Sequence, residues 1–119
     1  MSQMRALHLL IKHEGSRNPV SRRTGASTSG VTKAQAHEEL STILAKFEGM
    51  SGQPLVDAFA AEAQKRSDCG SFQQGGDLGL FGPGDMQQQF EAGVKSIQPG
   101  QISGIVDSDS GSHLIVRLQ

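Results

Sequence analysis

The stretch Arg5-Ala6-Leu7-His8-Leu9-Leu10-Ile11-Lys12-His13 is a short, mostly apolar run with polar side chains at positions 8 and 12. The β-branched Ile11 lies near its end, and a run of this length and composition predicts a buried β-strand. The next segment, residues 14–30, is rich in Gly, Ser, Thr, Asn, Pro and Arg, which predicts a basic, flexible loop. A loop this long inside a small domain is typical of a functional segment rather than a simple connection.

Two helices are predicted after this loop. Thr32 and Gln35 have the spacing of a capping box, and apolar residues then recur at helical intervals until Gly49. Pro54 opens a second helical stretch, which continues to about Arg66.

Glycines recur through the second half of the chain and separate short predicted elements from one another. Residues 78–81 predict a short strand, and residues 87–95 predict a third helix. Residues 102–106 and 113–118 predict two closing strands, separated by the polar stretch 107–112. The order is one strand, three helical segments with a strand among them, and a hairpin. It predicts an α+β fold in which helices surround a sheet.

The length and the cysteine content limit the class of protein. A chain of 119 residues fits a single domain, residues 1–119. Cys69 is the only cysteine, so no intramolecular disulfide can form, which suits a reducing compartment. We find neither a signal-peptide pattern nor the run of ~20 apolar residues that a membrane span needs. We therefore expect a monomeric cytoplasmic or nuclear protein that does not bind membranes.

Charge is distributed unevenly along the chain. The formal net charge of −1 argues against general affinity for nucleic acid. Residues 1–33 nevertheless carry six basic side chains and one acidic side chain, whereas the remainder is acidic. A local basic patch on a near-neutral protein fits a discrete anionic ligand such as phosphate better than a long polyanion. On charge alone, a solvated loop explains the patch equally well.

His8, Cys69 and His113 form a chemically distinctive set of residues that are distant in sequence. Two histidines and a cysteine could bind zinc, but the paired CxxC or HxxxH spacing of a zinc site is missing. A cysteine hydrolase needs a thiolate, a histidine base and an orienting group. Those residue types are present, but no hydrolase signature surrounds the cysteine. We expect no metal and no other cofactor.

Four segments of the chain, taken together, resemble one protein family. They are Arg5–His13; Ser67–Ser71 with Gly76–Phe81; Met86-Gln87 with Phe90-Glu91; and Asp109–Ile115. In order and spacing they resemble the parvulin-type peptidyl-prolyl cis/trans isomerases, specifically the Pin-type branch, over residues 5–119. Four ordered segments are more specific than any single short motif. The resemblance implies a four-stranded antiparallel sheet surrounded by helices.

The resemblance also implies roles for individual residues. The implied catalytic group comprises His8, Cys69, Ser110 and His113, and the implied proline pocket comprises Leu78, Met86 and Phe90, with Gln87 and Ser108 nearby. From residue type alone, plain core packing is the better explanation for the apolar members of the pocket. We expect the two histidines to hydrogen-bond each other and to position the cysteine and Ser110.

The family resemblance implies an enzyme that isomerises X-Pro bonds, with a preference for phosphoserine or phosphothreonine before the proline. Lys12 and Arg17 match the phosphate-binding positions of the family. Phosphate-specific members place two arginines side by side, whereas this chain has Arg17-Asn18. We therefore predict that Arg22 or Arg23 folds back to supply the missing charge.

Two-domain members of the family also carry an N-terminal WW module. Only four residues precede Arg5 and the chain contains no Trp, so we expect no WW module here. The expected partners are proteins that contain phosphorylated Ser/Thr-Pro motifs. The alternative is a non-enzymatic phosphopeptide-binding or chaperone-like module on the same fold, against which the intact set of site residues argues.

Overall fold

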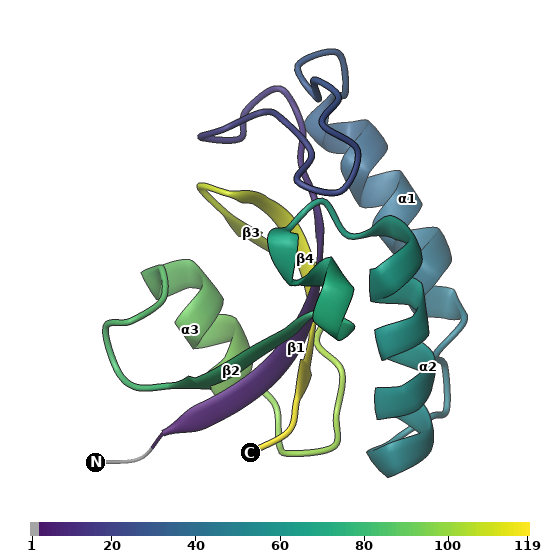
Figure 1. Cartoon of the computed structure of the whole chain (residues 1–119). Helices are drawn as coiled ribbons and strands as arrows, with labels where there is room; N and C mark the ends of the chain where they lie inside the picture. Colours follow the sequence, from purple (N-terminus) through teal and green to yellow (C-terminus); the bar gives the residue numbers. More distant parts are fainter. Residues whose placement is uncertain (1–2) are drawn as a thin grey trace.

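A four-stranded antiparallel sheet forms the centre of the molecule in the computed structural model, which describes residues 3–119 (Figure 1). The strands are arranged in the order β2-β1-β4-β3. Their bounds are β1 (Met4–Ile11), β2 (Asp77–Phe81), β3 (Val106–Ser108) and β4 (Gly111–Arg117). The prediction of an α+β fold with a four-stranded antiparallel sheet is confirmed.

Helices cover both faces of the sheet. α1 (Lys33–Ala45) and α2 (Gly52–Arg66) pack on one face, and α3 (Gln88–Lys95) packs on the other (Figure 1). A short 3₁₀ helix, η1 (Gly70–Gln74), connects α2 to β2. The predicted capping box is present: Thr32 Oγ1 accepts from the Gln35 backbone N–H, and the Gln35 side chain accepts from the Thr32 backbone N–H.

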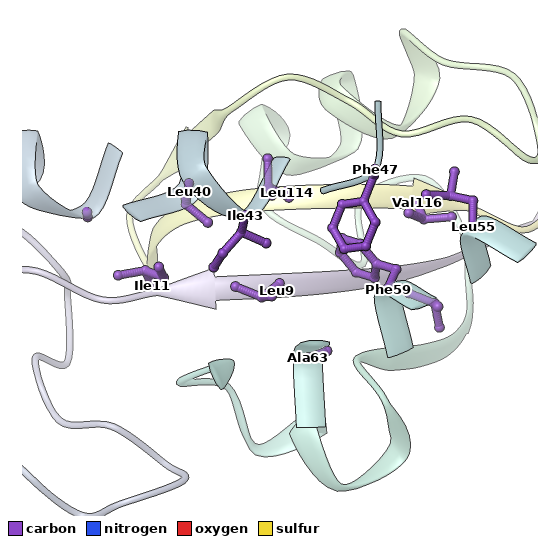
Figure 2. Close-up of a cluster of buried hydrophobic side chains, with 12 residues drawn as sticks. Leu9, Ile11, Leu40, Ile43, Phe47, Leu55, Phe59, Ala63, Leu114 and Val116 are labelled. Atoms are coloured by element: carbon purple, nitrogen blue, oxygen red, sulfur yellow. The ribbon is translucent and has the colours of Figure 1, made fainter. Parts of the chain in front are cut away.

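The main hydrophobic core lies between the sheet and the α1/α2 pair (Figure 2). It forms because side chains alternate across a strand, so that every second residue of β1 faces these two helices. β1 supplies Leu7, Leu9 and Ile11. The remaining buried members come from α1 and the turn after it, from α2 and from β4: Ala36, Leu40, Ile43, Phe47, Leu55, Phe59, Ala63, Leu114 and Val116.

The opposite face of β1 contributes to a second, smaller cluster under α3. Met4 and Ala6 pack there with Phe90 and Val94 of α3 and with Ile115 of β4. The same alternation places the side chain at position 8 on the α3 face, one step along from Ala6. β1 therefore builds the core with one face and the candidate site with the other.

The prediction of a closing strand at residues 102–106 is wrong. Ile102 makes only an isolated bridge to Val116, and the strand that pairs regularly with β4 is β3, which begins at Val106. The cause lies in Ser103, whose side-chain oxygen accepts from the Ile115 backbone N–H and so replaces a backbone partner in the ladder. The last strand also begins earlier than predicted, at Gly111.

No helix within residues 3–119 is long and apolar enough to cross a membrane.

Candidate active site

The two histidines of the predicted catalytic set lie side by side on the α3 face of the sheet. In the β1–β4 ladder His8 is opposite Ile115 and His113 is opposite Leu10, so the histidines are diagonal neighbours on one face. Their Nδ1 atoms are 3.0 Å apart, and their ring centroids are 5.2 Å apart with an interplanar angle of 24°. One Nδ1–H therefore donates to the other ring.

The Nε2 atom of each histidine ring lies within hydrogen-bonding distance of a serine hydroxyl. His8 Nε2 lies 3.2 Å from Ser71 Oγ, and His113 Nε2 lies 2.6 Å from Ser108 Oγ. A neutral ring that donates through Nδ1 can only accept through Nε2, and the ring that accepts at Nδ1 must donate through Nε2. The chain Ser71–His8–His113–Ser108 is therefore polarised in a single direction whenever both rings are neutral.

Ser110 is connected to this chain of hydrogen bonds through its backbone, because its N–H donates to Ser108 Oγ at 3.2 Å, but its side chain contacts neither histidine. Its Oγ accepts instead from Gln87 Nε2 at 3.1 Å. Ser108, predicted only as a neighbour of the pocket, is the residue that contacts His113. Sequence reasoning missed Ser71, although its place two residues after Cys69 at the start of η1 could have indicated it.

Burial controls the charge of His113. This residue is only 3% exposed. Its pKa lies well below the ordinary value, first because burial disfavours the imidazolium and second because of the charge of His8. His113 is therefore neutral near pH 7.

Cys69 follows the end of α2 and lies beside His8 and Ser71. Burial acts to raise the pKa of its thiol, but the polar contact and charge of His8 oppose this, and the polar contacts of Ser71 do so to a smaller extent. The net result lowers the pKa of Cys69 to about 6. The cysteine is the free thiol of the chain and is partly buried.

An apolar cavity of about 260 Å³ opens beside the histidine pair. Phe90 lines it, and the centroid of the Phe90 ring lies 5.4 Å from that of His8 and 5.1 Å from that of His113. The structure brings all five predicted pocket residues to this cavity, together with the four predicted catalytic residues. The full lining is His8, Arg17, Cys69, Leu78, Asp85, Met86, Gln87, Phe90, Ser108, Ser110 and His113.

A basic cavity of about 210 Å³ adjoins the apolar one. Arg17, Cys69 and Ser110 line both cavities. The rest of the basic lining is Leu10, Lys12, Asn18, Arg22 and Gly70. Of the two arginines predicted to compensate for Asn18, Arg22 reaches this cavity, whereas Arg23 is absent from its lining.

Lys12 is almost completely buried, at 7% exposure, and its Nζ donates to the Val20 carbonyl at 2.8 Å. Burial lowers the pKa of this lysine, while the negative charge of Asp68 opposes the shift. Binding of an anion in the cavity would favour the charged form of Lys12.

The buried Asp68 holds the basic loop next to Cys69. One carboxylate oxygen accepts from Ser21 Oγ at 2.7 Å, and the other accepts from the Lys12 backbone N–H at 3.0 Å. The Asp68 carbonyl accepts from the Arg22 backbone N–H, and its own N–H donates to the Leu10 carbonyl. The position of the loop is thus coupled to the position of Cys69, one residue further along the chain.

A backbone contact also ties this loop to the turn between β3 and β4. The Arg17 N–H donates to the Asp109 carbonyl at 2.7 Å, and the Asp109 N–H donates to Gln87 Oε1 at 2.9 Å. Figure 1 shows the loop and this turn at the same end of the sheet. Three segments far apart in sequence therefore meet around the two cavities.

No group of three or more His, Cys, Asp or Glu side chains suited to a metal ion occurs within the part of the chain that the structure describes.

A four-stranded antiparallel sheet that carries a hydrogen-bonded histidine pair, a cysteine beside it and an apolar pocket is typical of a rotamase-type domain. The match to the family described as "Rotamase: PPIC-type PPIASE domain" covers residues 8–119. The chain belongs to this family, the parvulin-type peptidyl-prolyl cis-trans isomerases.

Relatives and solved structures agree with this assignment. The chain is 42% identical to peptidyl-prolyl cis-trans isomerase Pin1 of Arabidopsis thaliana, over 97% of this chain and 94% of the relative. It is 42% identical to peptidyl-prolyl cis-trans isomerase ESS1 of Saccharomyces cerevisiae, over 98% of this chain but 65% of the relative. The chain therefore spans slightly less than two thirds of the yeast protein.

The fold is similar to that of TbPIN1 in solution, with a TM-score of 0.80 and 49% identity over the whole of both chains. It is also similar to ESS1 from Candida albicans, with a TM-score of 0.85 and 33% identity over 98% of this chain and 63% of the other.

Proposed function

We propose that this chain is a peptidyl-prolyl cis/trans isomerase that acts on X-Pro bonds of proteins and prefers phosphoserine or phosphothreonine before the proline. The observation that carries the proposal is the pair of adjoining cavities, one apolar and one basic, which share Arg17, Cys69 and Ser110. A proline ring fits the apolar cavity, a phosphate on the preceding residue fits the basic one, and the bond that rotates then lies between them.

The reaction requires rotation about an amide bond and breaks no bond. The barrier of ~18–20 kcal/mol arises from the partial double bond between carbon and nitrogen. Catalysis needs interactions that favour the twisted amide over the planar one. A ring seated among Leu78, Met86 and Phe90 is fixed while the preceding carbonyl turns, so the site supplies both an anchor and a water-poor environment for the rotation.

Cys69 is proposed to act on this rotation through its charge. A pKa of about 6 makes the thiolate the main form at neutral pH. The planar amide carries more negative charge on its oxygen than the twisted amide does, so a negative sulfur beside that oxygen destabilises the planar form more. The histidine pair supports this role because the contact with His8 keeps the pKa of the thiol low.

A covalent role, in which the thiolate attacks the carbonyl, makes a different prediction. Cys69→Ser and Cys69→Asp would both be inactive if attack were obligatory. We expect Cys69→Asp to keep substantial activity, because it supplies a negative charge without a sulfur nucleophile. Activity of Cys69→Asp at the background level would support the covalent route instead.

The decisive test of the isomerase activity is NMR exchange spectroscopy on matched peptides that contain phosphoserine-Pro, Ser-Pro and Glu-Pro. We expect cis/trans exchange to be accelerated on all three and most strongly on the phosphorylated peptide. No acceleration on any peptide would remove the enzyme claim and leave a phosphopeptide-binding module. Equal acceleration would keep the enzyme and remove the phosphate preference.

The phosphate preference is tested separately by removing single positive charges. Hydrogen bonds to charged groups contribute about 1.5–3 kcal/mol, so Arg17→Ala should lower the phosphorylated-to-unphosphorylated turnover ratio by about tenfold or more. Arg22→Ala and Arg23→Ala distinguish the two candidate helpers, and the cavity lining favours Arg22. Lys65→Ala removes an equal charge from the exposed surface of α2 and should leave the ratio unchanged. An unchanged ratio in Arg17→Ala would disprove the role of the loop.

The substrate proteins we propose are those that contain phosphorylated Ser/Thr-Pro motifs, and the compartments we propose are the cytoplasm and the nucleus. Pull-down with a phosphorylated and an unphosphorylated Ser-Pro peptide library, followed by sequencing, would test the first proposal. Equal recovery from the two libraries would contradict it.

A further inference from the structure

The edge strand β3 carries a residue of the active site but has few partners of its own. It is three residues long and pairs with β4 alone. Its side chains alternate, so Val106 and Ser108 share one face while Asp107 has the opposite one. Ser108 lies 2.6 Å from His113 Nε2, on the active-site face. The position of β3 therefore determines one end of the hydrogen-bonded chain through the two histidines.

Asp107 ties this strand to α1 across the other face of the sheet. Its Oδ1 accepts from His37 Nε2 at 2.8 Å and from the buried Ser112 Oγ at 2.6 Å. Its Oδ2 lies 3.5 Å from Lys33 Nζ, a longer and more exposed contact. His37 is thus the α1 side chain with a short hydrogen bond to the edge strand, because the lysine contact is beyond ordinary hydrogen-bonding distance.

We propose that His37 is a positioning residue for the active site: by holding Asp107 it fixes β3 and keeps Ser108 against His113. This inference rests on the proposed isomerase function. Asp107 and Ser108 share one peptide unit, so a displacement of the first moves the second. A hydrogen bond of 2.6 Å between oxygen and nitrogen is near its shortest length, and a shift of a few tenths of an ångström weakens it.

Several titratable groups lie close to His37 and Asp107. Lys33 on α1, Asp107 on β3, and His13 with Glu14 after β1 all face the same cluster. Burial acts to raise the pKa of the Asp107 carboxyl, and the hydrogen bonds from Ser112 and His37 act to lower it. The hydrogen bonds outweigh burial and hold its pKa below the ordinary value, so it stays ionised.

Because the Asp107 carboxylate is ionised, the hydrogen bond from His37 is charge-assisted and roughly twice as strong as a bond between neutral groups. Burial above all lowers the pKa of the neighbouring His13, so that imidazole adds little positive charge to the cluster.

The test compares three variants of the full chain. His37→Leu removes the donor, His37→Gln restores a neutral donor that does not titrate, and Glu38→Leu makes a matched change on the exposed side of α1. The readouts are kcat and KM on the phosphoserine-Pro peptide, and the ¹⁵N and ¹H shifts of the His113 imidazole, which report the bond to Ser108. Both are measured on all variants at one neutral pH.

We expect His37→Leu to lower kcat by about threefold to tenfold, the equivalent of one net hydrogen bond, with little change in KM. His37→Gln should recover most of kcat and should return the His113 signal to its wild-type position. Glu38→Leu should behave as wild type. If His37→Leu does not fold, His37→Ala replaces it and should give the same loss of kcat and the same change in the His113 signal.

Two results would overturn the inference: a kcat and a His113 signal in His37→Leu that match wild type, or a kcat in His37→Gln that is as low as in His37→Leu. A loss confined to KM would also overturn it. Inactivity of the wild-type protein would disprove the isomerase function, whereas the His113 signal would still test the connection from His37 to the site. The two failures are therefore distinguishable.

Discussion

The pKa of Cys69 depends on His8, and removing the charge of His8 should change the pKa in a direction that the structure fixes. Burial by itself raises the pKa of the thiol above its ordinary value, and the contact with His8 is the largest influence that lowers it. At pH 7 a pKa of about 6 makes roughly nine tenths of the thiol ionised. In His8→Gln the lowering charge is gone while burial remains, so the pKa should rise by about two units or more.

The assay is the pH dependence of alkylation by iodoacetamide, followed by mass spectrometry. Cys69 is the only cysteine, so every modified molecule reports this residue. The midpoint of the profile is the measurement, because a thiolate of low pKa is also a weaker nucleophile and absolute rates mix the two effects. We expect a wild-type midpoint near pH 6 and a smaller rise in Ser71→Ala than in His8→Gln. A wild-type midpoint above pH 8, or a larger effect of Ser71→Ala, would refute the reasoning.

Three further changes test the packing around the site. Gly76→Ala places a Cβ 2.2 Å from a β1 carbonyl oxygen at a φ of +86°, and should lower the free energy of unfolding in urea by at least about 2 kcal/mol. Gly79→Ala, at a φ of +74° in open space, should cost only about 1 kcal/mol, and equal losses would contradict the steric argument. Asp68→Asn should lower stability by about 3 kcal/mol by disrupting the buried contacts of the basic loop, whereas Asp57→Asn on the surface should change it by less than about 0.5 kcal/mol. Phe90→Ala should lower stability by about 3 kcal/mol and also abolish accelerated exchange at temperatures where the variant is folded; retained activity would exclude Phe90 from the pocket.

Strand β1 shows how far sequence reasoning reached. A run such as Leu7–Ile11 has a composition that decides its secondary structure locally, and the capping box at Thr32 is equally local. The partnership of His8 with His113 was expected only from the family resemblance. Nothing in the local sequence specifies that residue 113 pairs opposite residue 10, because the ladder is fixed by packing across the whole sheet.

The misplaced closing strand has its physical origin in a side chain that replaces a backbone partner. Ser103 accepts a hydrogen bond that a regular strand would have given to a carbonyl, and so the strand predicted there begins later. Ser108 and Ser110 are two residues apart and chemically equal, and only the turn between β3 and β4 decides which of them contacts His113. The pair of His37 and Asp107 has no local pattern at all, since 70 positions separate two ordinary surface residue types.

The two-faced use of β1 also limits how this chain could have diverged in evolution. Deleting or inserting one residue within β1 would turn Leu9 towards the apolar cavity and His8 into the main hydrophobic core, which would disrupt the core and the cavity lining together. Substitutions within β1 are therefore easier to accommodate than a change in its length. The segment that follows, residues 14–30, is not a strand with two buried faces. Insertions and deletions there are therefore easier to accommodate and could change substrate preference.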